Sequence, residues 1–464
     1  SQPYIWHWRD WIVESLNADR PYDQMIVQML AADEATPDDP QALRATGYLV
    51  RNWYKFNRNS WLDSTIEHTA KAFLALTLNC ARCHDHKYDP VSQADYYRFR
   101  AFFEPHNTRT DRLPGQPDTT KDGLARVYDA EPAAQTFLFT RGDERRPVKE
   151  RPLSPGVPTV LERQVALGEV TPITLPTPIH YPGFSPSVQD EQLTQARTLL
   201  KTRQDEHDAA TKALAAAPDD GKAQNTLAIA VKALQAARSG LASLESRIAA
   251  DRAKYAQPPA DADEPQSLAR SAAKTERLAH CDAAEEALLR AEITLADAEA
   301  AAADPKAKAD EAKKAVNDAK TKRDQARADL KTKKQALTQD NAAYSPLSPV
   351  YPATTTGRRL ALANWIANRK TPLTARVAIN HLWMRHFGAS LVPSEFDFGV
   401  NGRPTTHPEL LDWLAVAFMD GGWRMKPIHR MIVMSRAYRM QSYGEPNDPN
   451  LAIDPAHRDY WRRN

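Results

Sequence analysis

Cysteine is scarce in this sequence, which has three among its 464 residues. A disulfide scaffold needs several paired cysteines in a short chain and is therefore excluded. The sequence also lacks any apolar run of about eighteen residues, so no membrane-spanning helix is expected. Neither sign of charge dominates, because 61 Lys and Arg face 59 Asp and Glu, for a net charge of +2. That balance does not indicate a nucleic-acid partner.

Two of the three cysteines lie in one short motif. The segment Cys80-Ala81-Arg82-Cys83-His84 has the C-x-x-C-H spacing of a c-type haem attachment site. Each thiol can add to one vinyl group of the porphyrin, and the adjacent imidazole can bind the iron. The motif therefore predicts one covalent haem c, attached at Cys80 and Cys83, with His84 as the proximal iron ligand.

Other chemistries use the same pair of cysteines. A disulfide, a redox C-x-x-C pair or half of a zinc site would each involve Cys80 and Cys83. The zinc alternative would take its two remaining ligands from three histidines, His68, His84 and His86. No βαβ pattern surrounds the motif, as a thioredoxin-like site requires, and structural zinc sites usually take their second ligand pair from a distant segment. These considerations favour haem.

The second axial ligand of the iron is less constrained. His86 is too close to His84 along the chain to reach the opposite face of the porphyrin. We expect His68 as the distal ligand, although a straight helix from there to Cys80 would separate the two by roughly 18 Å. The alternatives are an open position, a ligand from another chain, or one of three other side chains, His106, Met25 and Met29.

The cellular location follows from the predicted cofactor. Covalent haem attachment at this motif normally takes place outside the cytoplasm, so the protein is predicted to be periplasmic or secreted. The N-terminal residues have no secretory leader pattern and begin inside a helical one. We therefore expect the sequence to be a mature or trimmed chain.

The apolar spacing predicts a mainly α protein. In the first hundred residues it indicates helices over 4–17, 22–32, 63–78 and 93–103. After residue 358 it indicates four more, over 360–366, 377–387, 408–421 and 427–438. His381 and His386 are five positions apart and share no helix face, so they are interpreted as packed or surface histidines rather than a metal pair.

Between these helical parts lie two segments of different amino-acid composition. Residues 106–186 are rich in proline and short apolar runs, which predicts a small β-rich module with strands over 136–140 and 170–175. Residues 187–341 are rich in Ala, Lys, Asp and Glu, and their apolar positions form a coiled-coil seam of Leu227, Val231, Leu234, Leu241 and Ile248.

The coiled-coil segment is interrupted at 217–221, 257–261 and 304–305, where prolines occur. These breaks predict four helices arranged as two antiparallel hairpins, a long insertion that could dock a protein partner. Cys281 lies in this segment and is interpreted as a small buried hydrophobic residue.

Two stretches resemble known domain families. Residues 67–97, including L-N-C-A-R-C-H-D-H-K-Y-D-P, resemble a planctomycete-type cytochrome domain of unknown function. Residues 359–423, including N-H-L-W and H-P-E-L-L-D-W-L, resemble the second uncharacterised domain that follows it in secreted proteins. The resemblance implies a chain that is an internal portion of a longer protein. It also implies a link to polysaccharide breakdown.

The sequence thus predicts four parts. They are a helical c-type haem domain (1–105), a β-rich module (106–186), an antiparallel coiled coil (187–344) and a C-terminal helical domain (345–464). The favoured function is an extracytoplasmic redox or electron-transfer protein that acts with a redox partner protein or a small oxidant. The alternatives are an interaction protein docked through its coiled coil, and a glycan-processing enzyme acting on a polysaccharide-related substrate. For the last, the carboxylates nearest the motif are Asp85 and Asp89.

Overall fold

The computed structural model describes residues 3–113, 115–256, 263–304, 308–442, 447–455 and 460. The chain is mainly α, as the sequence predicts, with three small two-stranded antiparallel sheets among the described residues. It divides into two units. The first contains the chain up to Pro176 and again from Pro352 onward, and the second is Thr177–Tyr351. The further division of the first unit into domains stays a prediction.

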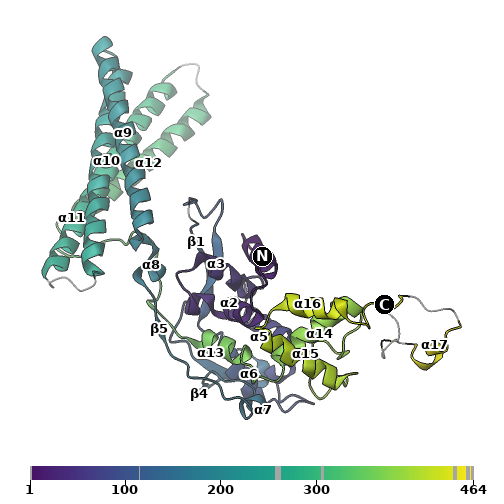
Figure 1. The fold of residues 1–464 in the computed structure, drawn as a ribbon. Coiled ribbons are helices and arrows are strands. Elements are labelled where there is room, and N and C mark those ends of the chain that lie inside the picture. The colour runs from purple at the N-terminus through teal and green to yellow at the C-terminus, as the bar shows by residue number, and fades with distance from the viewer. Residues whose placement is uncertain are drawn as a thin grey trace. The chain divides into compact units, whose positions relative to one another are not determined.

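The N-terminal part of the first unit is helical (Figure 1). Its elements are α1 (Trp6–Asn17), α2 (Tyr22–Ala35), α3 (Pro40–Leu43), η1 (Arg44–Thr46), α4 (Gly47–Val50), α5 (Arg58–Leu74), η2 (Asn79–Arg82) and α6 (Gln93–Arg100). Helix α5 begins where the Asn57 side chain accepts a hydrogen bond from the Ser60 N–H at 3.0 Å. It ends at Leu74 because Ala75 adopts a left-handed conformation, with φ 48°. The predicted extension of this helix to residue 78 is therefore wrong.

Three strand pairs follow. Strand β1 (His106–Asp111) pairs with β2 (Leu124–Asp129), and β3 (Thr136–Phe139) pairs with β4 (Pro147–Leu153). The turn η3 (Thr140–Gly142) links β3 to β4, and the short helix α7 (Thr159–Glu162) comes next. Of the strand predicted over 170–175, only β5 (Ile173–Thr174) forms. It pairs with β6 (Thr354–Thr355), which follows the second unit in the sequence.

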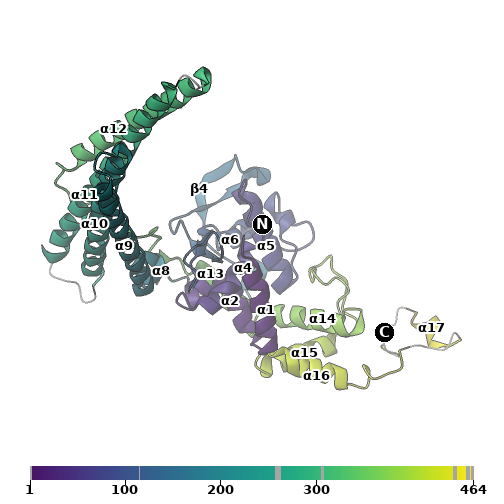
Figure 2. The ribbon, with the colours of Figure 1, turned by 90° about the horizontal axis from the view of Figure 1, so that it is seen from above.

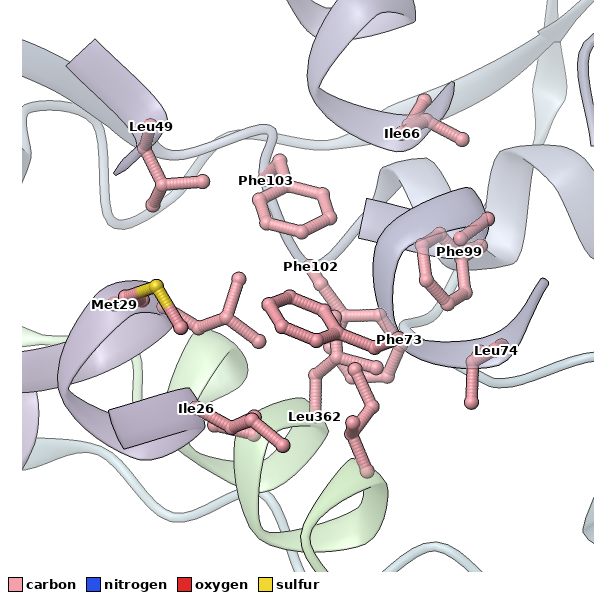
Figure 3. Close-up of a cluster of buried hydrophobic side chains, with 14 of the residues drawn as sticks. Ile26, Met29, Leu49, Ile66, Phe73, Leu74, Phe99, Phe102, Phe103 and Leu362 are labelled. Carbon is pink, nitrogen blue, oxygen red and sulfur yellow. The ribbon is translucent and has the colours of Figure 1, made fainter. Parts of the chain in front are cut away.

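The main core joins residues from both ends of the chain. Figure 3 shows Ile26 and Met29 of α2, Phe73 of α5 and Leu362 of α13 (Arg358–Ile366) pointing toward one another. Val127 of β2 belongs to the same cluster. Burial of this apolar surface is the main contribution to the stability of the unit, and it unites the N-terminal helices, the first sheet and the first C-terminal helix.

The remaining C-terminal helices form a second core. Helices α14 (Thr374–Phe387), α15 (Pro408–Asp420) and α16 (Met425–Met434) lie side by side in Figure 2 and contact one another, and the short α17 (Asn450–Ile453) follows. Their buried side chains include Trp383, Phe387, Leu414, Phe418 and Ile432. Helix α15 begins at Pro408 and ends just before Gly421, as the sequence predicts.

A buried arginine connects the N-terminal and C-terminal parts of this unit. Arg359 of α13 has no exposed surface and lies against three carboxylates, those of Asp33, Glu34 and Asp129. Asp33 and Glu34 follow a kink in α2, where Ala31 leaves the helical backbone with φ −153°. No periodic pattern singles out these four residues, and sequence reasoning missed them.

The second unit consists of long helices. After α8 (Thr177–His180) and η4 (Pro182–Phe184) come α9 (Pro186–Ala216), α10 (Gly221–Lys254), α11 (Asp263–Ala302) and α12 (Ala309–Ala336). Consecutive long helices pack on each other, as Figure 1 shows, and the short link from 217 to 220 makes α9 and α10 an antiparallel hairpin. The predicted break at 217–221 is confirmed. The prolines of the other two breaks lie outside the described residues.

Two predictions about single features of the chain can be compared with this structure. Cys281 is 4% exposed and packs with Ala284 and Leu330, which agrees with its interpretation as a small hydrophobic residue. Among the described helices, none combines the length and apolar character that a membrane crossing requires.

Candidate functional site

The cysteine motif folds as a short turn with two faces. Ala81 of η2 is fully buried in the main core, whereas Cys80 of the same turn and Cys83, the residue after it, are exposed. His84, the next residue, is exposed as well. The turn therefore presents both thiols and the imidazole outward while the alanine between them anchors it.

Arg82 fixes this turn from the protein side. Its carbonyl oxygen accepts hydrogen bonds from Gln93 Nε2 at 2.9 Å and from the Tyr97 hydroxyl at 3.1 Å, both on α6. Its guanidinium pairs with Asp63 of α5 at 2.9 Å. Tyr96 donates to the other oxygen of Asp63 at 2.5 Å. The backbone of the motif is thus held by two helices before any ligand binds.

Gly142, in the turn between β3 and β4, lies directly against Cys83. A Cβ atom at this position would come within 2.4 Å of the Cys83 sulfur. Its φ of +72° also favours glycine. The missing side chain therefore leaves the space that the Cys83 sulfur occupies.

The His84 ring is oriented by the backbone of the next residue, Asp85. Nδ1 lies 2.7 Å from the carbonyl oxygen of Asp85, which can only accept, so Nδ1 carries the proton. Nε2 is then the unprotonated nitrogen, the form that binds a metal ion. The Asp85 carboxylate is engaged elsewhere, because it accepts the backbone N–H of Gln93 at 2.7 Å.

His86 has a different role. Its side chain is 5% exposed, and its Nδ1 accepts the backbone N–H of Asp89 at 2.9 Å. That acceptor role requires the neutral ring with the proton on Nε2, which faces the Thr77 hydroxyl at 3.4 Å. The 3.5 Å approach of Nδ1 to the Asp89 carboxylate is therefore not an ion pair. His86 stabilises the loop after the motif.

Asp89 ends this loop with a contact to a distant segment. Its carboxylate accepts the backbone N–H of Val400 at 2.6 Å. A Cβ atom on Gly399 would come within 2.4 Å of the same carboxylate, so only glycine allows this approach. A second hydrogen bond runs from the Phe398 N–H to the Ala75 carbonyl at 2.8 Å. The loop around residue 399 is thus attached to both ends of the motif segment.

Comparison with known families matches one stretch at the start of the chain and another at its end. Residues 1–108 match PSCyt2, a protein of unknown function (DUF1549). Residues 358–464 match PSD1, a protein of unknown function (DUF1553). These are the two planctomycete domains that the sequence resembles. No curated protein and no solved structure matches the chain.

The candidate site draws on both matched parts. The PSCyt2 part supplies the cysteine turn, His84 and Asp89, and the PSD1 part supplies Gly399 and Val400. Arg359 of the PSD1 part is buried against Asp33 of the PSCyt2 part. Sequence reasoning identified the turn but not its contact with the PSD1 part, for which no local signal exists.

The candidate distal ligands lie in contrasting surroundings. His68 is exposed on α5, and its Nδ1 contacts the Ser64 carbonyl at 2.6 Å and Asn52 Nδ2 at 3.4 Å. His106 is fully buried against Trp61, and burial lowers its pKa to about 3. Its Nε2 has no hydrogen-bond partner. Met25 and Met29 are packed in the main core. Of these side chains, His68 is the one on the surface.

The histidines and cysteines do not assemble the zinc alternative. Across the described ranges, no three His, Cys, Asp or Glu side chains are grouped so that they could hold a metal ion. One histidine pair escaped the sequence reasoning: His386 Nε2 of α14 lies 2.7 Å from His429 Nδ1 of α16. Burial, aided by the neighbouring His429, lowers the pKa of His386. This agrees with a packed histidine.

Proposed function

We propose that this chain is an extracytoplasmic c-type haem protein that works in a redox reaction or in electron transfer. One haem c would be attached at Cys80 and Cys83, with His84 as the proximal ligand. The observation that carries this proposal is the two-faced turn, which exposes both thiols and His84 while Ala81 is buried beneath them. A C-x-x-C pair with a purely structural role would not need exposed thiols.

The residues around the turn fit such a group. Each thiol would add across one vinyl double bond, so that sulfur bonds to one carbon and the thiol hydrogen goes to the other, with nothing released and no oxidant consumed. The Asp85 carbonyl holds the proton on Nδ1 of His84 and leaves Nε2 as the ligand atom. Gly142 has no side chain that would displace the Cys83 sulfur from its place in the turn. The bound haem would supply an iron that changes between the ferrous and ferric states.

Intact-mass measurement under denaturing conditions tests this proposal. The protein, expressed with export and haem attachment, should be heavier than its polypeptide by one haem. The double variant Cys80→Ala/Cys83→Ala should lose the added mass. Cys281→Ala is the matched control, because this cysteine is buried in the second unit beside Ala284 and Leu330, and it should keep the haem. An unmodified mass, with zinc found by metal analysis of the native protein, would reject the proposal.

A second candidate is an interaction protein in which the second unit docks a partner. It is supported by the size of that unit, whose four long helices are mostly solvated along their outer faces. The two roles are compatible, since a redox partner could bind there. A polysaccharide-related substrate stays a prediction. The carboxylates of Asp85 and Asp89 both accept backbone N–H groups, so neither favours a glycan-processing role.

A further inference from the structure

Two histidines on adjacent helices of the PSD1 part point their ring nitrogens at each other. His386 of α14 and His429 of α16 are both half-buried, and their helices lie side by side in Figure 2. His386 Nε2 is 2.7 Å from His429 Nδ1, whereas the ring centroids are 5.0 Å apart. The two nitrogens therefore lie between the rings, which meet head to head.

This contact tolerates only certain protonation states. One of the facing nitrogens must carry a hydrogen and the other must not, because one donates and the other accepts. A further proton can be added to the outer nitrogen of the donor ring, and it strengthens the hydrogen bond by giving the donor a charge. When both rings are protonated, both facing nitrogens carry a hydrogen and no acceptor remains. Two like charges then stand in contact, so the doubly protonated pair must separate.

The surroundings of the pair offer no compensating negative charge. Among the described residues, no carboxylate bonds to either ring, and the other titratable group beside the pair is Tyr438, whose ring centroid is 5.6 Å from that of His386. Arg385 and Arg430 are next to the two histidines in sequence and are exposed cations. Burial, aided by the neighbouring His429, lowers the pKa of His386. The closed pair therefore resists a second proton.

Helix α16 is attached differently at its two ends. At its start, the Lys426 N–H donates to the Asp19 carboxylate and the Arg424 guanidinium donates to the Asp19 carbonyl, both at 3.0 Å. From residue 427 to residue 434, within the described contacts, His429 makes the only side-chain hydrogen bond to another element. Ile432 is buried in the second core on the same part of the helix. Loss of the histidine pair would thus free the C-terminal half of α16 while its start stays attached.

We propose that His386 and His429 form an acid-operated latch, which holds the C-terminal half of α16 on α14 near neutral pH and releases it when both rings are protonated. Release uncovers Ile432 and the face of Phe387 on which Tyr438 packs. The PSD1 part would then present new apolar surface in an acidic medium. This latch does not depend on the proposed haem.

Counting protons gives the direction of the pH effect. A histidine released to solvent has its ordinary pKa of about 6.5. Below that pH the open form carries two protons on the pair, whereas the closed form carries at most one. Acidification should therefore favour the open form about tenfold per pH unit, until the closed pair also takes its second proton. Above about pH 7 neither form carries the second proton, and the latch stays closed.

Hydrogen exchange of the full chain, followed by mass spectrometry at pH 7.5 and pH 5, tests the latch. Rates are corrected for the pH dependence of exchange in unprotected peptides. The protection of peptides from residues 428–440 should fall at least about tenfold between the two pH values. Peptides from α15, which belongs to the same core, should keep their protection. Equal protection of 428–440 at both pH values would overturn the proposal.

Conservative variants locate the effect. His429→Asn and His386→Gln each replace one ring by an amide whose oxygen can accept from the remaining histidine, whether that histidine is neutral or charged. Each variant should therefore keep the protection of 428–440 at pH 5. Where a variant is less protected already at pH 7.5, the ratio between the two pH values is compared.

His381→Gln is the matched control. His381 lies on the same helix and burial also lowers its pKa, but its ring faces Phe396 instead of another histidine. This variant should open in acid as the wild type does. The proposal is overturned if His429→Asn and His386→Gln both open in acid like the wild type, or if His381→Gln abolishes the opening. Failure of haem attachment would leave these results unaffected.

Discussion

Arg359 donates a hydrogen bond to each carboxylate oxygen of Asp33, both at 2.7 Å, in the fully buried centre of the first unit. This bidentate ion pair joins α13 to α2. Asp129 accepts from the same guanidinium at 3.0 Å, and Glu34 approaches it at 3.3 Å. One cation therefore faces three carboxyl groups away from water, an arrangement that is costly unless at least one carboxyl is neutral.

Burial raises the pKa of both Asp33 and Glu34, but both Asp33 oxygens accept from Arg359, so we assign the neutral carboxyl to Glu34. The Thr355 hydroxyl lies 2.9 Å from Glu34 Oε1 and 2.9 Å from Asp129 Oδ2, but it has one hydrogen to donate. Burial raises the pKa of Glu34 to about 8. Burial also acts on Asp129, but Arg359 and the donors of Thr356 outweigh it and lower the pKa of Asp129 to about 2. Thr355 therefore donates its hydrogen bond to Asp129 and accepts one from the protonated carboxyl of Glu34.

This assignment predicts how stability depends on pH. Between the ordinary pKa of 4.5 and the folded value of about 8, the folded protein keeps a proton on Glu34 that the unfolded chain has released. The contribution of Glu34 to the free energy of unfolding must then fall as pH rises through this window and level off above it. Glu34→Gln mimics the protonated form and removes this slope.

Denaturant unfolding at pH 5, 7 and 9 measures the effect. The stability of Glu34→Gln relative to wild type should increase with pH by about 1 kcal/mol or more. Asp33→Asn is the comparison variant, because both Asp33 oxygens accept from Arg359; it should lose roughly 3–5 kcal/mol at every pH. A constant difference between Glu34→Gln and wild type across this range would contradict a protonated Glu34.

Gly142→Ala is expected to prevent normal haem attachment at Cys83. The new methyl group would stand 2.4 Å from the sulfur, which must then move. The intact mass should show a reduced haem fraction, to roughly half or less, with a peptide map locating the loss at Cys83. Gly115→Ala is the matched control, since Gly115 also has a positive φ, of 78°, but no atom within 4 Å of the added Cβ. Equal haem fractions in the two variants would rule out the steric explanation.

His68→Ala tests the distal ligand. If His68 binds the iron, the variant should convert a low-spin six-coordinate optical spectrum into a high-spin one. His280→Ala removes an exposed histidine of α11 and should leave the spectrum unchanged. A low-spin spectrum that survives in His68→Ala would exclude this residue and direct attention to His106 or to a ligand from another chain.

The second unit should be removable without loss of the first. Its two ends meet at β5 and β6, where the Leu175 N–H donates to the Ala353 carbonyl at 2.8 Å. Replacing residues 176–352 by Asn-Gly would close this strand pair as a tight hairpin. The shortened protein should stay soluble, attach haem and keep its melting temperature within about 5 °C. Aggregation, or loss of haem attachment, would show that the helices are needed to fold the first unit.

Local features of the chain were readable from its sequence. Apolar periodicity located the long helices of the second unit, and Pro408 and Gly421 marked the ends of α15. The spacing of Cys80, Cys83 and His84 identified the exposed turn. Each of these signals lies within a single helix or turn, which is why the sequence alone determines these elements.

One local prediction failed for a physical reason. The helix predicted over 63–78 ends at Leu74, because Ala75 takes a left-handed conformation that usually calls for glycine. That conformation is supported by hydrogen bonds from the Leu76 N–H to the Ala70 carbonyl and from the Phe398 N–H to the Ala75 carbonyl. The second of these hydrogen bonds comes from a segment far away in the sequence, so no local pattern could indicate it.

Only the tertiary structure decided which distant groups meet. From the sequence alone, Arg359 would be taken for a surface arginine and Asp89 for an ordinary loop residue. In the structure, the packing of α13 on α2 buries Arg359 against Asp33, and the Val400 N–H donates to Asp89. Burial changes the cost of a charge and the pKa of a carboxyl, but it is a property of the assembled core and leaves no periodic trace in the sequence. The sequence therefore determined the cysteine turn and the helices, whereas packing determined that both ends of the chain build the surroundings of that turn.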